Sequence, residues 1–189
     1  MKKCMSIWCS IVFIGALLLV SGCGHSTKEV EVKKPMVSAE GVYVNQELGF
    51  SVEYPADKLT IKAPVKPPLL LNVVGPKKLP SLMILALDKP AKLPLENSGV
   101  LVVGLLKKSF PKSQRHKLLK QEIITLANGK KANYIEMKWK YDRTLTLITT
   151  GTVAYKNGKA VIVIASNVPT GVTPISVLES WVKTLKFYK

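Results

Sequence analysis

Apolar and polar side chains alternate along several consecutive stretches in the second half of the chain. In the clearest one, Ile135, Met137 and Trp139 are separated by Glu136 and Lys138. Because successive side chains of a strand point to opposite faces, this period of two predicts half-buried β-strands. Asn-Gly pairs at 128–129 and 157–158 lie between strand-like runs and predict hairpin turns. We therefore predict a four-stranded antiparallel meander over residues 117–126, 131–140, 144–155 and 159–166, with the unbroken apolar run 160–165 as a central strand.

Shorter strands are expected in the first half of the chain. Phe50, Val52 and Tyr54 alternate with polar residues, and Pro55 ends that run. Apolar runs predict three further strands: 42–44, 69–74 and 81–87. Five prolines between residues 56 and 80 predict an otherwise irregular crossing segment.

Two stretches have the helical period instead. The first, predicted at 96–110 and ended by Pro111, has these apolar residues at helical spacing: Val100, Val103, Leu106 and Phe110. The second follows Thr173 as cap and Pro174 as first helical residue, with this apolar face: Ile175, Leu178, Trp181, Val182 and Leu185. Helices on both sides of an antiparallel meander predict an α+β fold, arranged as an α/β/α sandwich.

The N-terminus has a charged start followed by a continuous apolar run. Lys2 and Lys3 precede the run 7–20, which suits a signal peptide and is shorter than the about 20 residues of a membrane-spanning helix. The run ends in Val20-Ser21-Gly22-Cys23, a lipobox whose thiol is the nucleophile that lipid attachment requires. We predict a signal peptide at 1–22 and lipidation of Cys23. An uncleaved anchor and a plain secretory signal are the alternatives.

The predicted signal peptide divides the chain into a leader, a tether and a domain, and it places the mature protein outside the cytoplasm. Residues 23–40 have mixed charge and read as a lipidated cysteine with a flexible tether, and residues 41–189 have the length of a single domain. Cys4 and Cys9 leave with the signal, so the domain has no cysteine for a disulfide or a metal. We expect lipid attachment to a membrane of the cell envelope, facing outside the cytoplasm. The segment 20–23 resembles the bacterial lipoprotein pattern, and with Gly24 in place of Asp that resemblance implies the outer membrane if the cell has one.

The chain is strongly basic. It has 28 Lys and Arg against 12 Asp and Glu, a net charge of +16, and keeps +14 without residues 1–22. Such a protein attracts polyanions. Outside the cytoplasm we expect an anionic lipid surface, lipopolysaccharide, teichoic acid or an acidic protein, and no nucleic acid. A lysine-rich surface that only confers solubility is the alternative.

The charge is concentrated in one stretch. Residues 97–121 contain no Asp or Glu. Their six basic residues are the candidate partner-binding set: Lys107, Lys108, Lys112, Arg115, Lys117 and Lys120.

The sequence offers no motif for catalysis. His116 is the only histidine of the domain and lies among lysines, whereas a metal site needs three or four ligands. A Ser-His-Asp arrangement around His116 lacks a Gly-x-Ser-x-Gly turn, and no Gly-rich phosphate loop is present. Trp139 and Tyr141 beside Lys138 could stack on a ligand, but alternating core packing explains them better. We expect no enzymatic activity, no metal and no cofactor.

The order of these elements resembles the PsbP-like fold family, which includes the extrinsic subunit of the photosystem II oxygen-evolving complex. The resemblance spans most of residues 41–189. It rests on the segment from Gly49 to Pro55, Phe110-Pro111, residues 155–158, and the ending 181–187. Leu59 stands near the place where the family often has a tryptophan. The resemblance implies a non-enzymatic accessory or scaffold role, often at a membrane complex, and assigns no functional residue.

Two functions follow from these observations. The first is a lipid-anchored accessory protein that docks on an anionic partner or envelope surface. The alternative is a carrier of a small hydrophobic ligand or lipid, held in a pocket between sheet and helix and lined by the apolar runs 69–71 and 82–87.

Overall fold

The computed structural model describes residues 36–38, 40–62, 65–171 and 173–188. The signal peptide, Cys23 and most of the tether predicted from the sequence lie outside these residues. The described elements are, in chain order, β1 (Met36–Val37), β2 (Val42–Asn45), β3 (Phe50–Glu53), β4 (Thr60–Ile61), β5 (Leu69–Val74), β6 (Ser81–Asp88), the 3₁₀ turn η1 (Leu95–Asn97), α1 (Gly99–Ser109), β7 (Gln114–Thr125), β8 (Lys131–Lys140), β9 (Thr146–Lys156), β10 (Lys159–Asn167), α2 (Ile175–Val182) and β11 (Lys186–Phe187).

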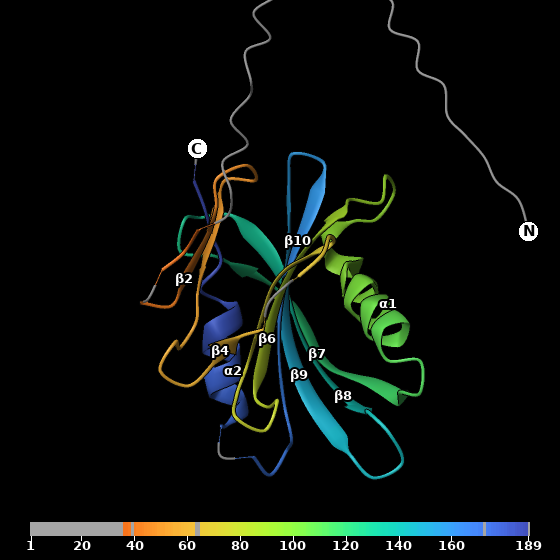
Figure 1. The fold of residues 1–189 in the computed structure, drawn as a ribbon. Coiled ribbons are helices and arrows are strands. Elements are labelled where there is room, and N and C mark those ends of the chain that lie inside the picture. The colour runs from red at the N-terminus through yellow and green to blue at the C-terminus, as the bar shows by residue number, and fades with distance from the viewer. Residues whose placement is uncertain (1–35, 39, 63–64, 172, 189) are drawn as a thin grey trace, which may run out of the picture. The chain divides into compact units, whose positions relative to one another are not determined.

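A seven-stranded antiparallel sheet forms the centre of the domain (Figure 1). Its order is β4-β5-β6-β10-β9-β8-β7, so the predicted meander β7 to β10 is confirmed. β10 lies between β9 and β6, and residues 160–165 are buried on both faces, which confirms the predicted central strand. The two Asn-Gly pairs join β7 to β8 and β9 to β10 as expected, and Asn157 and Gly158 both have positive φ, as such hairpin turns require.

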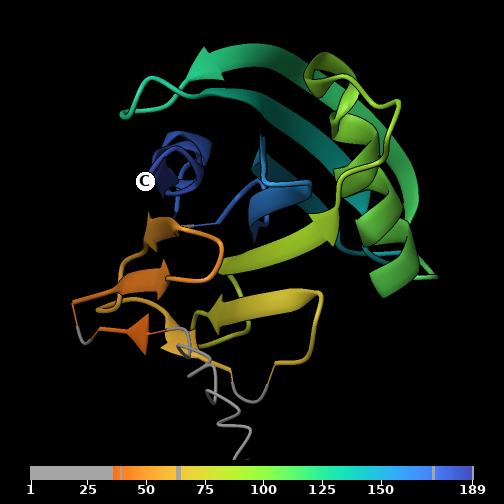
Figure 2. The same cartoon turned by 90° about the horizontal axis from the view of Figure 1, so that it is seen from above.

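The two faces of this sheet carry separate hydrophobic cores. On β8, Met137 and Trp139 point to the core that α1 covers, and Tyr134 points to the core that α2 covers. A second sheet, ordered β1-β2-β3-β11, shares the α2 core through Tyr43, Phe50 and Phe187. Figure 2 shows this small sheet beside α2, away from α1. The predicted α+β fold with an antiparallel meander and flanking helices is confirmed.

The first predicted helix is correct in place and partly correct in its buried face, because Leu106 is buried and Val103 and Phe110 pack on the core, whereas Val100 does not. The segment 96–110 is a 3₁₀ turn followed by α1, and Val100 is 60% exposed. The buried side of α1 consists of Gly99, Val102 and Leu106. A Cβ at Gly99 would lie 3.2 Å from Ile135 Cγ2, so glycine lets the helix start directly against the sheet. That close approach rotates Val100 outward.

The C-terminal segment also differs from its prediction. Pro174 precedes α2 in an extended conformation, and no side chain caps the helix, so the assigned roles of Thr173 and Pro174 are wrong. α2 ends at Val182 instead of continuing to Leu185, because the chain turns so that Lys186 and Phe187 pair with Ser51 and Phe50. Leu185 remains buried, as part of that turn.

The small sheet begins before the predicted domain start. Met36 and Val37, which the sequence places in the tether, pair with Val44 and Tyr43. The paired structure therefore extends several residues ahead of Gly41.

Candidate functional site

Four of the six predicted basic residues gather where α1 is connected to β7. We call Lys107, Lys108, Lys112 and Arg115 the basic corner. All four side chains are exposed. Phe110 anchors the connection, because its ring packs 5.4 Å from Trp139 and 5.2 Å from Tyr141 between centroids. The corner is therefore a solvated set of charges on a firmly packed base.

His116 lies directly beside the basic corner. Its ring stacks on Trp139 at 5.8 Å and 9° between planes, and its Nε2 is 3.1 Å from Ser113 Oγ. Burial, and then the nearby Lys107 ammonium, hold the pKa of His116 below its ordinary value. Its contacts are those of a packed side chain, and the part of the chain that the structure describes has no cluster of three or more metal-binding side chains.

Lys117 and Lys120 lie on the face of the sheet opposite to the one that carries α1, Trp139 and His116. Lys117 pairs with Lys138, and Lys120 pairs with Glu136. Directly paired residues of antiparallel strands point to the same face, which here is the α2 face of β8. The six residues therefore do not form one surface, because strand alternation after the β7 bulges separates them.

Lys120 is also neutralised by its surroundings. Its Nζ lies 2.7 Å from Glu122 Oε1, and the Tyr134 ring centroid is 5.4 Å away. Glu136 and Glu179 contribute further negative charge near it. A lysine that already has a carboxylate partner adds little attraction for an external anion.

A second basic region lies at the other end of the meander, and the sequence reasoning missed it. A pocket of about 870 Å³ is formed by the two Asn-Gly hairpin turns, the β2–β3 turn and the end of β11. We call it the hairpin-end pocket and define it by Gly49, Lys130, Lys156 and Phe187. A signal was present in the sequence: Lys130 follows one Asn-Gly pair and Lys156 precedes the other, and alternate hairpins of a meander have their turns at the same end.

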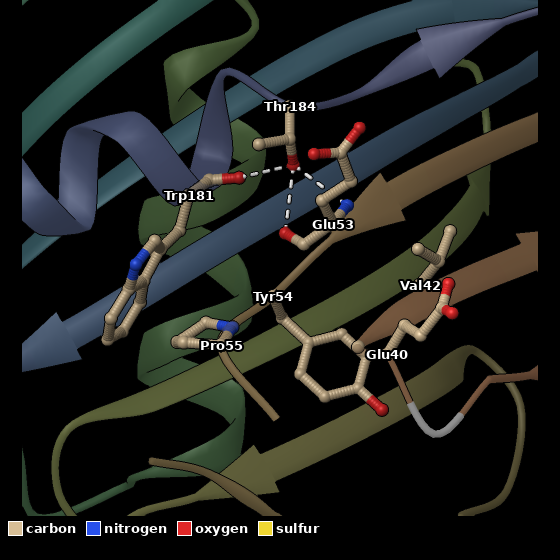
Figure 3. Close-up of a pocket in the computed structure, with 8 residues that line it drawn as sticks. Glu40, Val42, Glu53, Tyr54, Pro55, Trp181 and Thr184 are labelled. Atoms are coloured by element: carbon tan, nitrogen blue, oxygen red, sulfur yellow. Dashed lines mark hydrogen bonds between the residues drawn. The ribbon is translucent and has the colours of Figure 1, made fainter. Parts of the chain in front are cut away.

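A smaller pocket of about 300 Å³ lies between α2, β3 and the segment that enters β2 (Figure 3). Figure 3 shows the Thr184 hydroxyl between Trp181 and the backbone of Glu53. That hydroxyl donates to a backbone carbonyl and accepts the Glu53 N–H, and the Glu53 carboxylate is 2.7 Å from Lys186 Nζ. These polar groups bond to one another across elements of the fold, so few hydrogen-bonding groups of the pocket are left for a ligand.

The comparisons with known proteins concern the fold. No family model matches the sequence, and no curated protein matches it. The solution structure of cyanobacterial PsbP (CyanoP) from Synechocystis sp. PCC 6803 superposes with a TM-score of 0.60, covering 89% of this chain and 99% of that one at 13% identity. The protein has a PsbP-like fold. The resemblance stated from the sequence is thereby confirmed.

Two further solved structures are less similar to this PsbP-like chain. A crystal structure from Bacteroides thetaiotaomicron VPI-5482 gives a TM-score of 0.48 at 13% identity, over 80% of this chain and 50% of that one. The protein of unknown function PA94 from Pseudomonas aeruginosa gives 0.37 at 16% identity, over 68% and 82%. At these identities the likeness concerns architecture alone. Among the described residues, no helix is both long and apolar enough to cross a membrane.

Proposed function

We propose that this protein is a lipid-anchored accessory protein of the cell envelope that docks on an anionic partner or membrane surface through its basic corner. The observation that carries the proposal is that Lys107, Lys108, Lys112 and Arg115 are all exposed where α1 connects to β7, beside the packed ring of Phe110. The lipobox at residues 20–23 and the net charge of +14 without the signal support it. Lipid and basic charge reinforce each other, since each lysine near an anionic surface contributes about 1 kcal/mol.

The proposed role is non-enzymatic, as the PsbP-like resemblance implies. As part of the proposal, α1, the large sheet and α2 form the expected α/β/α sandwich, with the small sheet added on the α2 side. The carrier alternative stays a prediction. The smaller pocket lies between α2 and β3, but neither it nor the hairpin-end pocket is lined by the runs 69–71 and 82–87, so no observation favours the carrier.

Charge reversal tests the docking surface. The mature chain from residue 23 is prepared with Cys23→Ser, so that lipid does not mask the effect. Lys107→Glu, Lys112→Glu and Arg115→Glu together should weaken binding to phosphatidylglycerol vesicles more than tenfold at low salt. The melt should change little, because exposed substitutions each shift stability by about 0.5 kcal/mol or less.

The control places the same charge change elsewhere on the surface. Lys62, Lys77 and Lys92 are exposed and lie outside the corner. Their triple reversal to Glu should weaken binding clearly less than the corner variant. Equal loss in both variants would mean that only total charge matters, and the basic corner would not be the docking surface.

Lipid attachment is tested separately in cells. The full chain should incorporate labelled fatty acid and sediment with membranes, and Cys23→Ser should do neither. Labelled lipid on the Cys23→Ser protein would contradict the proposed anchor.

A further inference from the structure

The hairpin-end pocket lies at the opposite end of the large sheet from the basic corner. In Figure 1 the β9–β10 turn is at the top of the sheet, and the turn joining β8 to β9 is at the bottom, near the end of α1. The pocket is therefore a separate basic site, built by different residues from those of the proposed docking surface.

Lys156 is held in place at the pocket wall by two backbone carbonyls. Its Nζ donates to Gly49 O at 2.9 Å and to Tyr188 O at 2.6 Å. An ammonium group has three hydrogens to donate, so one remains for another acceptor. The charge itself is not compensated, because neutral carbonyls supply both contacts.

Lys130 brings a second ammonium group to the same place. Its Nζ lies 4.7 Å from the Phe187 ring centroid, and that of Lys156 lies 5.5 Å from the same centroid. Burial and the positive charge of Lys156 lower the pKa of Lys130. Two cations that repel each other are thus held against one aromatic ring.

The described residues supply no counter-charge to this pair. Every ion pair within 4 Å among them involves other lysines, and Glu47, the only carboxylate lining the pocket, reaches neither ammonium at that distance. Asn128 is used internally, since its Nδ2 donates to Phe187 O at 2.6 Å. Among residues 36–188 as the structure describes them, the site therefore has two positive charges, free donor capacity and space, but no anion paired with either lysine.

We propose that the hairpin-end pocket binds a phosphate group, whose oxygens accept hydrogen bonds from Lys130 and Lys156. A phosphate monoester carries a charge near minus two and matches both ammonium groups, whereas a carboxylate would leave one unmatched. Lysine is well suited to phosphate as a compact point charge. The phosphate can belong to a soluble ester or to a lipid headgroup, and the experiment separates the two sources.

The first measurement is an NMR titration of the ¹⁵N-labelled mature chain carrying Cys23→Ser. Inorganic phosphate should shift the amide signals of Gly129, Asn157 and Phe187, beyond the effect of sodium chloride at equal ionic strength. Lys130→Gln should weaken the affinity about tenfold or more, the effect of losing one charge-assisted hydrogen bond. Lys131→Gln is the matched control, because Lys131 belongs to the same hairpin but bonds to Thr125 Oγ1 outside the pocket.

A second readout does not depend on fold stability. Phosphate should raise the pKa of Lys130, followed by the side-chain ¹³Cε signal, because an anion favours the charged form. Saturation by inorganic phosphate identifies a soluble ligand class. Shifts of the same amides only with phosphatidic acid vesicles identify a lipid headgroup.

Two results would overturn the proposal. One is the absence of shifts at the pocket with both probes, and the other is equal phosphate affinity in the wild type and the Lys130→Gln variant. The triple reversal of the basic corner should leave the affinity for inorganic phosphate within about twofold, since the two regions are separated by more than the screening distance of about 8 Å in physiological salt. Failure of one proposal is therefore distinguishable from failure of the other.

Discussion

The basic corner and the hairpin-end pocket use the same kind of side chain at opposite ends of the same strands, but in different physical states. The lysines of the corner project into solvent from one continuous stretch of chain. Lys130 and Lys156 are half-buried, come from two separate hairpins and lie against Phe187. Exposed charges attract a partner at long range and are screened by salt, whereas charges held in fixed positions bind a ligand through direct contacts. The density of charged residues along a sequence therefore reveals the basic corner but not the hairpin-end pocket.

The largest expected difference between the two ends concerns their aromatic residues. Phe187 is 8% exposed and packs 6.1 Å from Phe50 between ring centroids. Phe187→Ala should lower the free energy of unfolding by about 3 kcal/mol, because a buried aromatic ring leaves a cavity. Tyr141→Ala at the corner end should cost only about 1 kcal/mol, since that ring is 39% exposed. Urea denaturation measures both, and equal losses would contradict the idea that Phe187 is built more deeply into the core than Tyr141.

The next effect concerns the lysines themselves. Lys156→Met removes the donor to the Gly49 and Tyr188 carbonyls and should cost about 2 kcal/mol, in the range of hydrogen bonds to charged groups. Lys112→Met at the corner should stay within about 0.5 kcal/mol of the wild type. Urea denaturation measures both variants. A Lys156→Met protein as stable as the wild type would show that the hydrogen bonds of this lysine do not stabilise the C-terminal strand.

The smallest effect tests the electrostatics of the corner. Burial and Lys107 lower the pKa of His116. The folded state therefore binds this proton more weakly than the unfolded state. The stability that this difference provides is present above the ordinary pKa of about 6.5 and is lost as the pH falls through the lower folded-state value.

Lys107→Gln should raise the pKa of His116 by removing the second of these causes, and NMR titration of the imidazole Cε1 proton measures it. Lys108→Gln, one residue along the helix, is the matched control and should change the value less. If the two variants gave the same pKa, Lys107 would not be the charge that acts on His116.

The sequence predicted most of the large sheet because its signals are local. Alternation and the two Asn-Gly pairs determine β7 to β10, and an apolar run buried on both sides determines β10. It predicted the strands β2 and β3 but not their pairing with β11 in a separate small sheet, because the pairing of Phe50 with Phe187 depends on contacts between residues far apart in the chain. The exposure of Val100 was missed for a related reason, since Gly99 is buried through contacts with Gln121 and Ile135 on the sheet.

The candidate site was predicted in part. The four basic residues nearest Pro111 are all exposed around the connection from α1 to β7, because a short connection keeps chain neighbours close. Strand alternation and the bulges of β7 separate Lys117 and Lys120 from these four residues. Arg115 lies in one of the bulges and has a positive φ, which no feature of the sequence predicts. Predicting the hairpin-end pocket would have required knowing that β11 returns to line it together with both hairpin turns.

The return of β11 to β3 also sets the order in which the chain can fold. Strands β2 and β3 are made early, but their neighbour Phe187 is among the last described residues. Until that segment has joined the sheet, the buried ring of Phe50 lacks its contact with Phe187 and the early strands remain an incomplete sheet. Contacts between such distant segments are slow to form because the intervening chain must first be ordered. Completion of the small sheet is therefore expected as a late event in folding, after the local hairpins of the meander have formed.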